Sequence, residues 1–262
     1  MDRRDFLTAG KTKKAAPVNP IAFASPTRTL SGINPYTGPW TVNEVIHLLK
    51  RTMFGAKKAD VDFFAAMSMN QAVDALLNVP LAQFTPAPPI KNYANSVDPA
   101  DPDNAIAAGQ TWVNINTNDG SVDSNRTNAY RNWWIGQMVN QNRNILEKMT
   151  LFWHNHFATE TDSIGRAIWC YQNNTVLRKN ALGNFKQFVK EMTTNTGMLR
   201  YQNGYLNTNT APDENYGREL QELFVVGKGA DNATQGYAEA DVKAAAKVLT
   251  GWQINGNTNT AV

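Results

Sequence analysis

Four side chains in two segments have the types and spacing to bind a metal ion. His154 and His156 form a His-x-His pair, and Glu219 and Glu222 stand three residues apart further along the chain. Imidazole nitrogens and carboxylate oxygens are the ligands of Zn²⁺ at catalytic sites, where a carboxylate can also act as general base. The four residues predict a divalent-metal site, for example for Zn, and a metal-dependent hydrolase is one hypothesis for the chain.

The histidine pair lies in a segment whose apolar residues repeat at helical spacing. Successive side chains of a helix turn by about 100°, so His154 and His156 would point about 160° apart, one on each flank of the buried stripe. Each ring would then bond to a different neighbour, and a shared ion would require the helix to end or distort at His154. A structural role is therefore the leading interpretation for both, and a metal or catalytic role is the alternative.

The segment with the glutamates carries further charges at helical spacing. Glu214 and Arg218 precede Glu222 at intervals of four residues and, with Asn215, predict a structural network. Three arrangements stay open: a buried network between helices, a solvated charged face, or a metal or catalytic role. Gly217 costs about 1 kcal/mol in a helix interior relative to Ala, which suggests that another backbone approaches closely there.

Charge and composition exclude several classes of protein. The chain has 262 residues and a net charge of +3, and its first fourteen residues hold five basic and two acidic side chains, so the remainder is neutral. A neutral body is a poor binder of nucleic acid, whose phosphates must be neutralised. The single cysteine, Cys170, excludes an internal disulfide and is expected to be a buried thiol. No apolar run approaches the ~18 residues of a transmembrane segment.

The first residues resemble the core of a twin-arginine export signal. Arg3 and Arg4 precede a Phe-Leu step, but lysines occupy the place where an apolar region should begin. Two interpretations remain: an exported, periplasmic protein, or a disordered basic arm on a cytoplasmic one. In both, residues 1–39 are expected to be a disordered basic leader outside the fold.

The rest of the chain predicts an all-α fold, a multi-helix globular bundle over residues 40–252. Thr41 and Glu44 fit a capping box at the first helix, and Gly55 is expected to cap its end. Residues 79–124 form one long Pro/Asn-rich loop or insertion, which Trp112 is expected to anchor, and residues 253–262 form a polar tail. Helices are expected near residues 42–53, 59–67, 69–78, 126–141, 143–157, 163–181, 184–194, 213–226 and 238–250.

Several motifs in order resemble one bacterial family. They are residues 47–55 (HLLKRTMFG), 147–157 (EKMTLFWHNHF), 181–185 (ALGNF), 198–201 (MLRY), 214–224 (ENYGRELQELF) and 249–252 (LTGW). Their order and spacing resemble the family catalogued as domain of unknown function 1800. Asp213 departs from the family, which usually has Asn there.

The resemblance implies a helical protein that often carries an export signal and has no established activity. Because members commonly continue past the last motif, it also implies that this chain is the N-terminal part of the family domain. We therefore expect a helical bacterial protein of the cell envelope that acts by binding a protein or carbohydrate partner. The metal-dependent hydrolase is the alternative, and whether the chain is an enzyme at all stays open.

Overall fold

The computed structural model describes residues 34–117, 119–227 and 236–262. The chain divides into two units, Met1–Pro39 and Trp40–Val262, which are described separately. In the first unit, the Tyr36 hydroxyl donates a hydrogen bond to the Pro39 carbonyl at 3.0 Å. The predicted export-signal segment lies outside the described residues. Everything below concerns the second unit.

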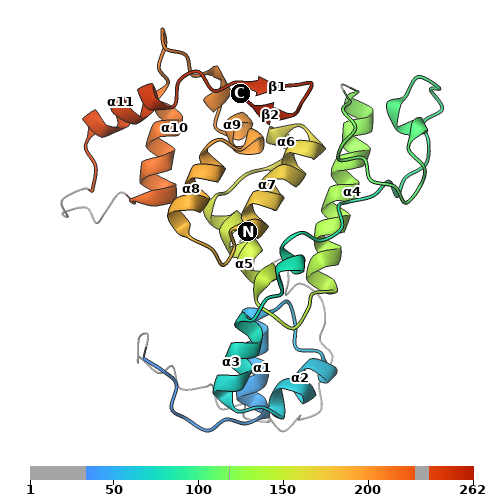
Figure 1. The fold of residues 1–262 in the computed structure, drawn as a ribbon, viewed down its shortest axis with the longest axis vertical. Coiled ribbons are helices and arrows are strands. Elements are labelled where there is room, and N and C mark those ends of the chain that lie inside the picture. The colour runs from blue at the N-terminus through green and yellow to red at the C-terminus, as the bar shows by residue number, and fades with distance from the viewer. Residues whose placement is uncertain (1–33, 118, 228–235) are drawn as a thin grey trace, which may run out of the picture. The chain divides into compact units, whose positions relative to one another are not determined.

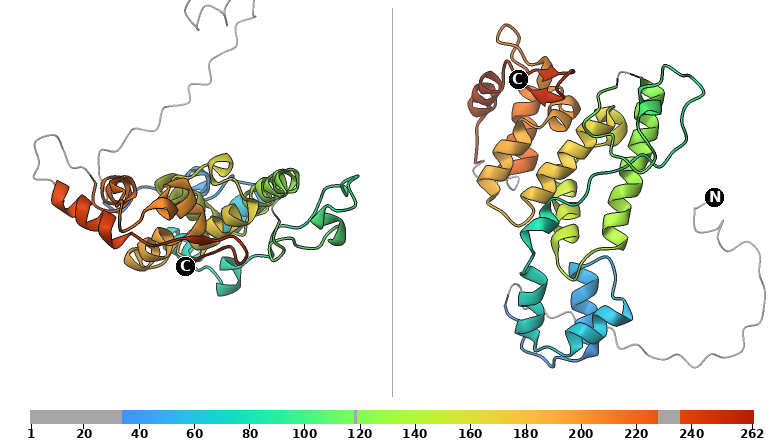
Figure 2. Two further views of the ribbon diagram at one scale, coloured as in Figure 1. Left: turned by 90° about the horizontal axis from the view of Figure 1, so that it is seen from above. Right: turned by 45° about the vertical axis from the view of Figure 1, so that its right-hand side comes forward.

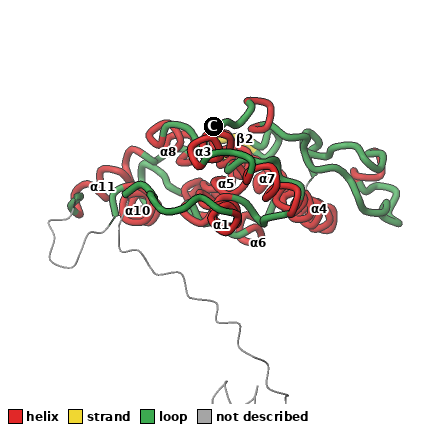
Figure 3. Tube along the Cα trace, turned by 90° about the horizontal axis from the view of Figure 1, so that it is seen from below, coloured by secondary structure: helices red, strands yellow, loops and turns green. Residues whose placement is uncertain are grey.

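Helices account for nearly all regular structure in the described part of the second unit (Figure 3). The α-helices are α1 (Val42–Thr52), α2 (Lys58–Ala65), α3 (Met69–Leu77), α4 (Gly120–Val139), α5 (Leu146–His156), α6 (Thr161–Ile164), α7 (Ala167–Lys179), α8 (Phe185–Thr193), α9 (Thr196–Tyr201), α10 (Glu214–Glu219) and α11 (Glu239–Val248). The short 3₁₀ turns are η2 (Leu81–Phe84), η3 (Pro102–Ala105) and η4 (Gly204–Leu206), and η5 (Leu220–Val225) is a π-helix. The predicted all-α class is confirmed.

The first helix begins as predicted and ends differently. Thr41 and Glu44 form the capping box, in which each residue satisfies a free backbone N–H of the other. The predicted cap at Gly55 is wrong, because Gly55 does not have a positive φ. Met53 leaves the helix in an extended conformation instead, with φ −131°. Its apolar side chain is buried in the core of α1–α3, and the helix ends there without a glycine turn.

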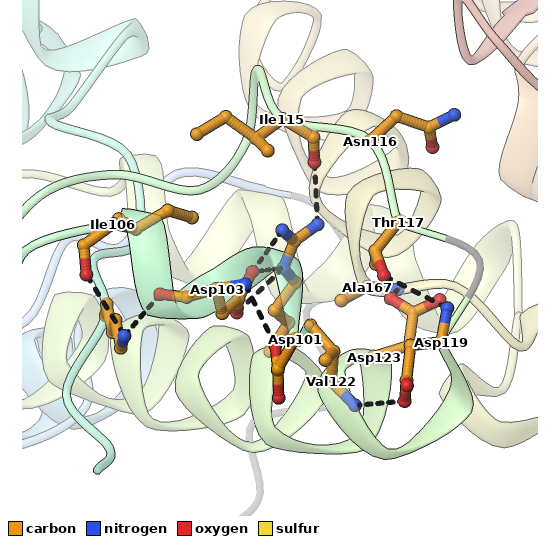
Figure 4. Close-up of polar contacts among 12 residues, drawn as sticks. Asp101, Asp103, Ile106, Ile115, Asn116, Thr117, Asp119, Val122, Asp123 and Ala167 are labelled. Atoms are coloured by element: carbon orange, nitrogen blue, oxygen red, sulfur yellow. Dashed lines mark hydrogen bonds and ion pairs between the residues drawn. The ribbon is translucent and has the colours of Figure 1, made fainter. Parts of the chain in front are cut away.

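One long helix was expected over residues 163–181, and the structure divides it into α6 and α7. Gly165 adopts φ +74°, a left-handed conformation that glycine tolerates and that ends α6. The backbone N–H of Ala167, at the start of α7, then donates to Asp123 Oδ1 of α4 at 3.1 Å (Figure 4). A carboxylate from another helix thus caps α7, an arrangement that local periodicity does not reveal.

α7 is the central helix of the larger core. It packs against α4, α5, α8 and α9, and both ribbon views place it between α4 and α8 (Figures 1 and 2). One buried cluster joins α4, α6 and α7 around Trp112, and a second joins α5, α7, α8, α9 and α10 around Phe157. The first three helices have their own apolar cluster.

The Pro/Asn-rich segment 79–124 is held by buried charges. Asp103 accepts hydrogen bonds from Arg126 Nη2 at 2.5 Å and from Arg126 Nε, and also from the Tyr93 hydroxyl. Arg126 Nη1 donates to the Ile115 carbonyl at 2.7 Å (Figure 4). Lys91 Nζ donates to the carbonyls of Asp103 and Ile106. Burial, followed by the Asp103 hydrogen bond, raises the pKa of Tyr93.

Trp112 anchors this segment as predicted. It is fully buried in the cluster formed with α4 and α7, and the guanidinium of Arg126 lies 5.6 Å from its ring centre. The segment is therefore an integral part of the packed structure.

The last ten residues, expected as a polar tail, form an antiparallel hairpin. β1 (Ile254–Asn255) pairs with β2 (Thr260–Ala261). Asn259 adopts φ +53°, which Asn tolerates better than most residues. Its side-chain oxygen accepts a hydrogen bond from Trp169 Nε1 at 3.0 Å, so the turn is fixed to α7. In Figure 1 the hairpin lies beside α9, which it contacts.

Gly217 lies where α10 and α11 touch, as its place in a helix interior suggested. A Cβ atom there would lie 3.1 Å from Ala246 N and 3.2 Å from Val242 O. We expect Gly217→Ala to lower the free energy of unfolding by about 1–2 kcal/mol, because overpacking outweighs the gain in helix propensity. The measurement is urea denaturation followed by circular dichroism.

Gly136→Ala is the matched control for Gly217→Ala. Gly136 lies inside α4, and no atom would come within 4 Å of an added Cβ. This variant should gain up to about 1 kcal/mol of stability. Equal changes in the two variants would contradict the close approach of α10 and α11.

Candidate functional site

His156 closes the end of the π-helix. Its Nε2 atom lies 2.7 Å from the carbonyl oxygen of Phe224, which can only accept, so Nε2–H is the donor. The last carbonyls of a helix lack partners within the helix, and a basic side chain is a common source of hydrogen bonds for them. His156 thus links α5 to η5, and its ring also touches Phe157 and Phe185.

His154 faces the other flank of α5, as the helical spacing predicted. Its ring packs edge-on against Trp134 of α4, with 4.9 Å between the ring centres. Burial lowers the pKa of His154 below its ordinary value of 6.5. The two histidines therefore contact different helices, and the structure does not bring their rings together.

The half-buried position of His154 predicts a loss of stability in acid. In the unfolded chain the ring binds a proton below about pH 6.5, whereas the folded protein resists protonation until a lower pH. The free energy of unfolding should therefore fall as the pH drops below 6.5 and level off below the folded pKa. Urea denaturation across this range should show a weaker pH dependence for His154→Gln than for the wild type. A wild-type stability that is flat or rising toward acid pH would contradict the account of His154.

The two glutamates of the predicted metal site lie on either side of a change in helix type. Glu219 ends α10, and Glu222 lies within the π-helix η5. In a π-helix the backbone bonds run from i to i+5, so three residues cover a smaller part of a turn than in an α-helix. Glu219 and Glu222 are therefore less aligned than α-helical spacing predicts. The Tyr237 hydroxyl donates to Glu222 Oε2 at 3.2 Å.

The structure brings the histidine segment next to the glutamate segment through the bond from His156 to the Phe224 carbonyl and through ring contacts of Phe224 with His156 and Phe157. Among the described residues, no three His, Cys, Asp or Glu side chains lie close enough together to hold a metal ion. The site of His154, His156, Glu219 and Glu222, and the hydrolase that it would serve, thus remain predictions that this geometry does not favour.

Arg218 connects α10 with α11 at the surface. It forms an ion pair with Glu239 at 2.6 Å and a longer one with Glu214 at 3.4 Å. All three side chains are more than one-third exposed, so the network joins two helices without being buried. Asn215 contributes its backbone N–H, which donates to Asp213 Oδ1 and caps α10. The network therefore shares one feature with each of two arrangements left open by the sequence: it joins two helices, as in a network between helices, and it is solvated, as on a charged surface.

Cys170 is buried in the core, as expected. Burial raises the pKa of its thiol to about 12, so it is protonated at neutral pH.

Comparison with known protein families finds one family whose model matches most of the chain. A family model described as "Protein of unknown function (DUF1800)" matches residues 47–262. The chain belongs to the DUF1800 family. Comparisons with curated proteins and with solved structures gave no match.

The motifs that resemble the DUF1800 family meet in one part of the core. Trp153 Nε1 donates to the Ala181 carbonyl at 2.9 Å, and the Tyr216 hydroxyl donates to the Thr193 carbonyl at 3.0 Å. His156 makes the same kind of bond to Phe224. In each case a side chain from a family motif satisfies a backbone carbonyl of a different element. This pattern supports a structural role for these motifs.

An open groove on the DUF1800 domain has the size of a ligand site. It has a volume of about 520 Å³ and lies between α7, the junction of α8 with α9, and the C-terminal hairpin. Ligand pockets commonly measure about 300–1,000 Å³. Two aromatic side chains line it: Tyr171 of α7 and Trp252, the last residue of the final family motif.

Polar groups surround the two aromatic rings. Gln172 Oε1 already accepts a hydrogen bond from Thr196, at 2.7 Å. Four polar groups on the lining residues have no hydrogen-bond partner among the described residues: the Tyr171 hydroxyl, Gln172 Nε2, the Thr194 hydroxyl and Trp252 Nε1. These groups are available to a ligand.

Glu191 is the one carboxylate among the described residues that line the groove. Although desolvation acts to raise its pKa, hydrogen bonds from Gln187, Asn180 and Lys179 lower the pKa overall. Glu191 is therefore ionised at neutral pH and can only accept hydrogen bonds.

Two asparagines that the sequence analysis did not single out position this groove. Asn207 is buried, and its side chain bonds to the Ala246 carbonyl and to the Asp213 N–H. Its own carbonyl accepts from Gly251, the residue before Trp252, at 3.0 Å. Asn259 fixes the hairpin through Trp169. Both lie in Asn/Thr-rich stretches, where nothing in the local pattern distinguishes them from solvated neighbours.

Proposed function

We propose that this DUF1800 domain is a binding module, and that its groove takes up a carbohydrate. The observation that carries the proposal is that the residues lining one groove of about 520 Å³ include two aromatic rings and four hydrogen-bonding groups without a partner among the described residues. A sugar ring has an apolar face bordered by hydroxyl groups. Amphipathic rings such as Tyr and Trp match such a ligand, because they offer both apolar area and a polar group.

The hydrogen-bonding groups suit hydroxyls in particular. Gln172 and Trp252 present N–H donors, whereas the Thr194 and Tyr171 hydroxyls can donate or accept. Glu191 is ionised and accepts only. A sugar hydroxyl both donates and accepts, so it can pair with each of the first four groups, whereas both Glu191 oxygens already accept hydrogen bonds within the protein.

The lining supports binding rather than cleavage. Hydrolysis of glycosidic bonds usually uses a pair of carboxyl groups, one as acid and one as nucleophile or base. Glu191 is the single carboxylate among the described lining residues, and its lowered pKa disfavours a role as general acid.

Binding in the envelope is the setting that we propose, on the basis of the twin-arginine-like start. That start lies outside the described residues, so it rests on Arg3 and Arg4 in the sequence alone. Among the described residues, no helix is long and apolar enough to cross a membrane.

Titration calorimetry with soluble oligosaccharides tests the binding. A panel of cellotetraose, xylotetraose, maltotetraose and chitotetraose samples the common sugar classes. At least one should bind saturably at millimolar concentration or below. Trp252→Ala should weaken that binding by about tenfold or more, which corresponds to about 1.4 kcal/mol. Tyr171→Phe removes only a hydroxyl and should weaken it less.

Two control variants separate the groove from the rest of the surface. Phe152 is an exposed aromatic residue on α5, and Tyr201 lies in α9 outside the groove. Phe152→Ala and Tyr201→Phe should bind like the wild type. The proposal fails if no oligosaccharide of the panel binds, or if the groove variants and the controls bind alike.

A further inference from the structure

A second, smaller cavity lies where α4 ends and α5 begins. It has a volume of about 210 Å³, and its walls come from η2, the last turn of α4, residues 140–144 and the first turn of α5. At about 30 Å³ for each water-sized volume, it accommodates on the order of seven non-hydrogen atoms. A ligand of this cavity is therefore small.

Amide side chains make up most of the polar wall. Asn144 is buried and donates from Nδ2 to Gln83 Oε1 at 2.6 Å, while its Oδ1 accepts from the Leu146 N–H at 3.1 Å. Gln137 lines the same cavity from the last turn of α4, and Gln141 lines it from the connection that follows. The Gln83–Asn144 bond fixes two of these amides in place.

Gln141 provides the observation that points to a ligand. Its Oε1 atom is buried and has no hydrogen-bond partner among the described residues. A buried acceptor without a partner is energetically unfavourable, and native structures contain few of them. Because the amide can turn by 180°, the group that completes it must be able either to donate or to accept. A hydroxyl does both.

The charges at the cavity compensate each other. Glu147 is the single ionisable residue among the described lining residues. Both of its oxygens accept hydrogen bonds from Arg178, one of them at 3.0 Å. An anion would therefore find no free cation here, and a zwitterion would find no pair of opposite charges. A neutral molecule with several hydroxyls matches this lining, because hydroxyls can both donate to and accept from the amides.

We infer that this cavity is a binding site for a small neutral polyol, between glycerol and xylitol in size, held by Gln141 and its neighbouring amides. The site is separate from the groove of Tyr171 and Trp252, and it does not depend on the function proposed for that groove. It would join the end of α4 to the start of α5 through the ligand.

Saturation-transfer difference NMR with glycerol, erythritol and xylitol as separate probes tests this site. Polyols stabilise proteins generally by exclusion from their surface, so a melting temperature alone would not be specific. The wild type should give a saturable signal with at least one probe at millimolar concentration. Gln141→Met keeps the volume of the side chain and removes its hydrogen bonds, and it should weaken binding by about tenfold or more. Gln137→Met is a second lining variant and should weaken binding in the same direction.

Two further variants act as controls. Gln110 is exposed outside the cavity, and Gln110→Met should bind polyol like the wild type. Trp252→Ala should also bind polyol normally, so failure of the groove proposal and of this inference can be told apart. The inference is overturned if no probe gives a saturable signal, or if Gln141→Met and Gln137→Met both bind like the wild type.

Discussion

Asp103→Asn is expected to lower the free energy of unfolding by about 3–5 kcal/mol. Asp103 and Arg126 are both buried, and their ion pair fixes the 79–124 segment to α4. Without the carboxylate, the Arg126 charge stays buried and uncompensated, and the Tyr93 hydroxyl faces an amide instead of an anion. The loss is a large part of the 5–15 kcal/mol that usually stabilises a domain. Urea denaturation with an unchanged m-value would measure it.

Replacing both Asp103 and Arg126 with apolar residues should not restore the free energy of unfolding of the wild type. Arg126 also donates to the Ile115 carbonyl, and Asp103 also accepts from Tyr93. In Asp103→Leu/Arg126→Met these groups would lose their partners and remain buried, which costs free energy. The double variant should therefore stay at least about 2 kcal/mol less stable than the wild type. A stable double variant would show that the network around Asp103 contributes little.

Arg178→Met is expected to lower the free energy of unfolding by about 3–5 kcal/mol, because it also leaves a buried charge without its partner. Arg178 of α7 is buried, and it makes a two-pronged contact with the buried Glu147 of α5. The variant leaves the Glu147 carboxylate without a cation in the α5–α7 interface. Because Glu147 also lines the small cavity, part of its charge can be solvated there, which places the expected loss toward 3 kcal/mol. Thermal and urea denaturation would measure it.

This second pair should respond differently to a double replacement. Arg178 Nε has no hydrogen-bond partner among the described residues, so the pair is incompletely satisfied even in the wild type. Glu147→Leu/Arg178→Met should recover most of the stability lost in Arg178→Met, as well-packed apolar residues often replace a buried pair without loss. Asp62→Asn, which breaks the exposed pair with Lys58, is the control and should cost no more than about 1 kcal/mol. Equal losses in Asp62→Asn and Arg178→Met would contradict the importance of burial.

Local sequence signals predicted the class of fold and the beginnings of several helices. The capping box at Thr41 and the apolar spacing of α5 depend only on residues close together in the chain. Gly165 shows the limit of such signals, because the choice between a helix interior and a left-handed turn depends on the capping of α7 by Asp123 of α4. The prediction of a cap at Gly55 failed in a similar way, because the helix ends at Met53, whose side chain is buried against other helices. Contacts made by distant residues decide where these helices end.

The candidate sites depend even more on distant contacts. Helical spacing correctly placed His154 and His156 on opposite flanks of α5. It could not show that His156 would meet the last turn of a π-helix, since the apolar spacing of residues 213–226 predicts an α-helix there. The groove joins Tyr171, Thr194 and Trp252, which lie far apart in the sequence. Its supports, Asn207 and Asn259, are two of 31 asparagines, and neither stands out before the chain is folded.

NMR of the indole N–H groups tests the central proposal, carbohydrate binding in the groove, most directly. The chain has seven tryptophans, and Trp252 is the one that lines the groove. Titration with the tetrasaccharide panel should shift the Trp252 Nε1–H signal saturably and leave that of the buried Trp112 unchanged. Assignment by Trp252→Phe would identify the signal. A binding oligosaccharide that leaves the Trp252 signal in place, or the absence of any shift with the whole panel, would contradict the account.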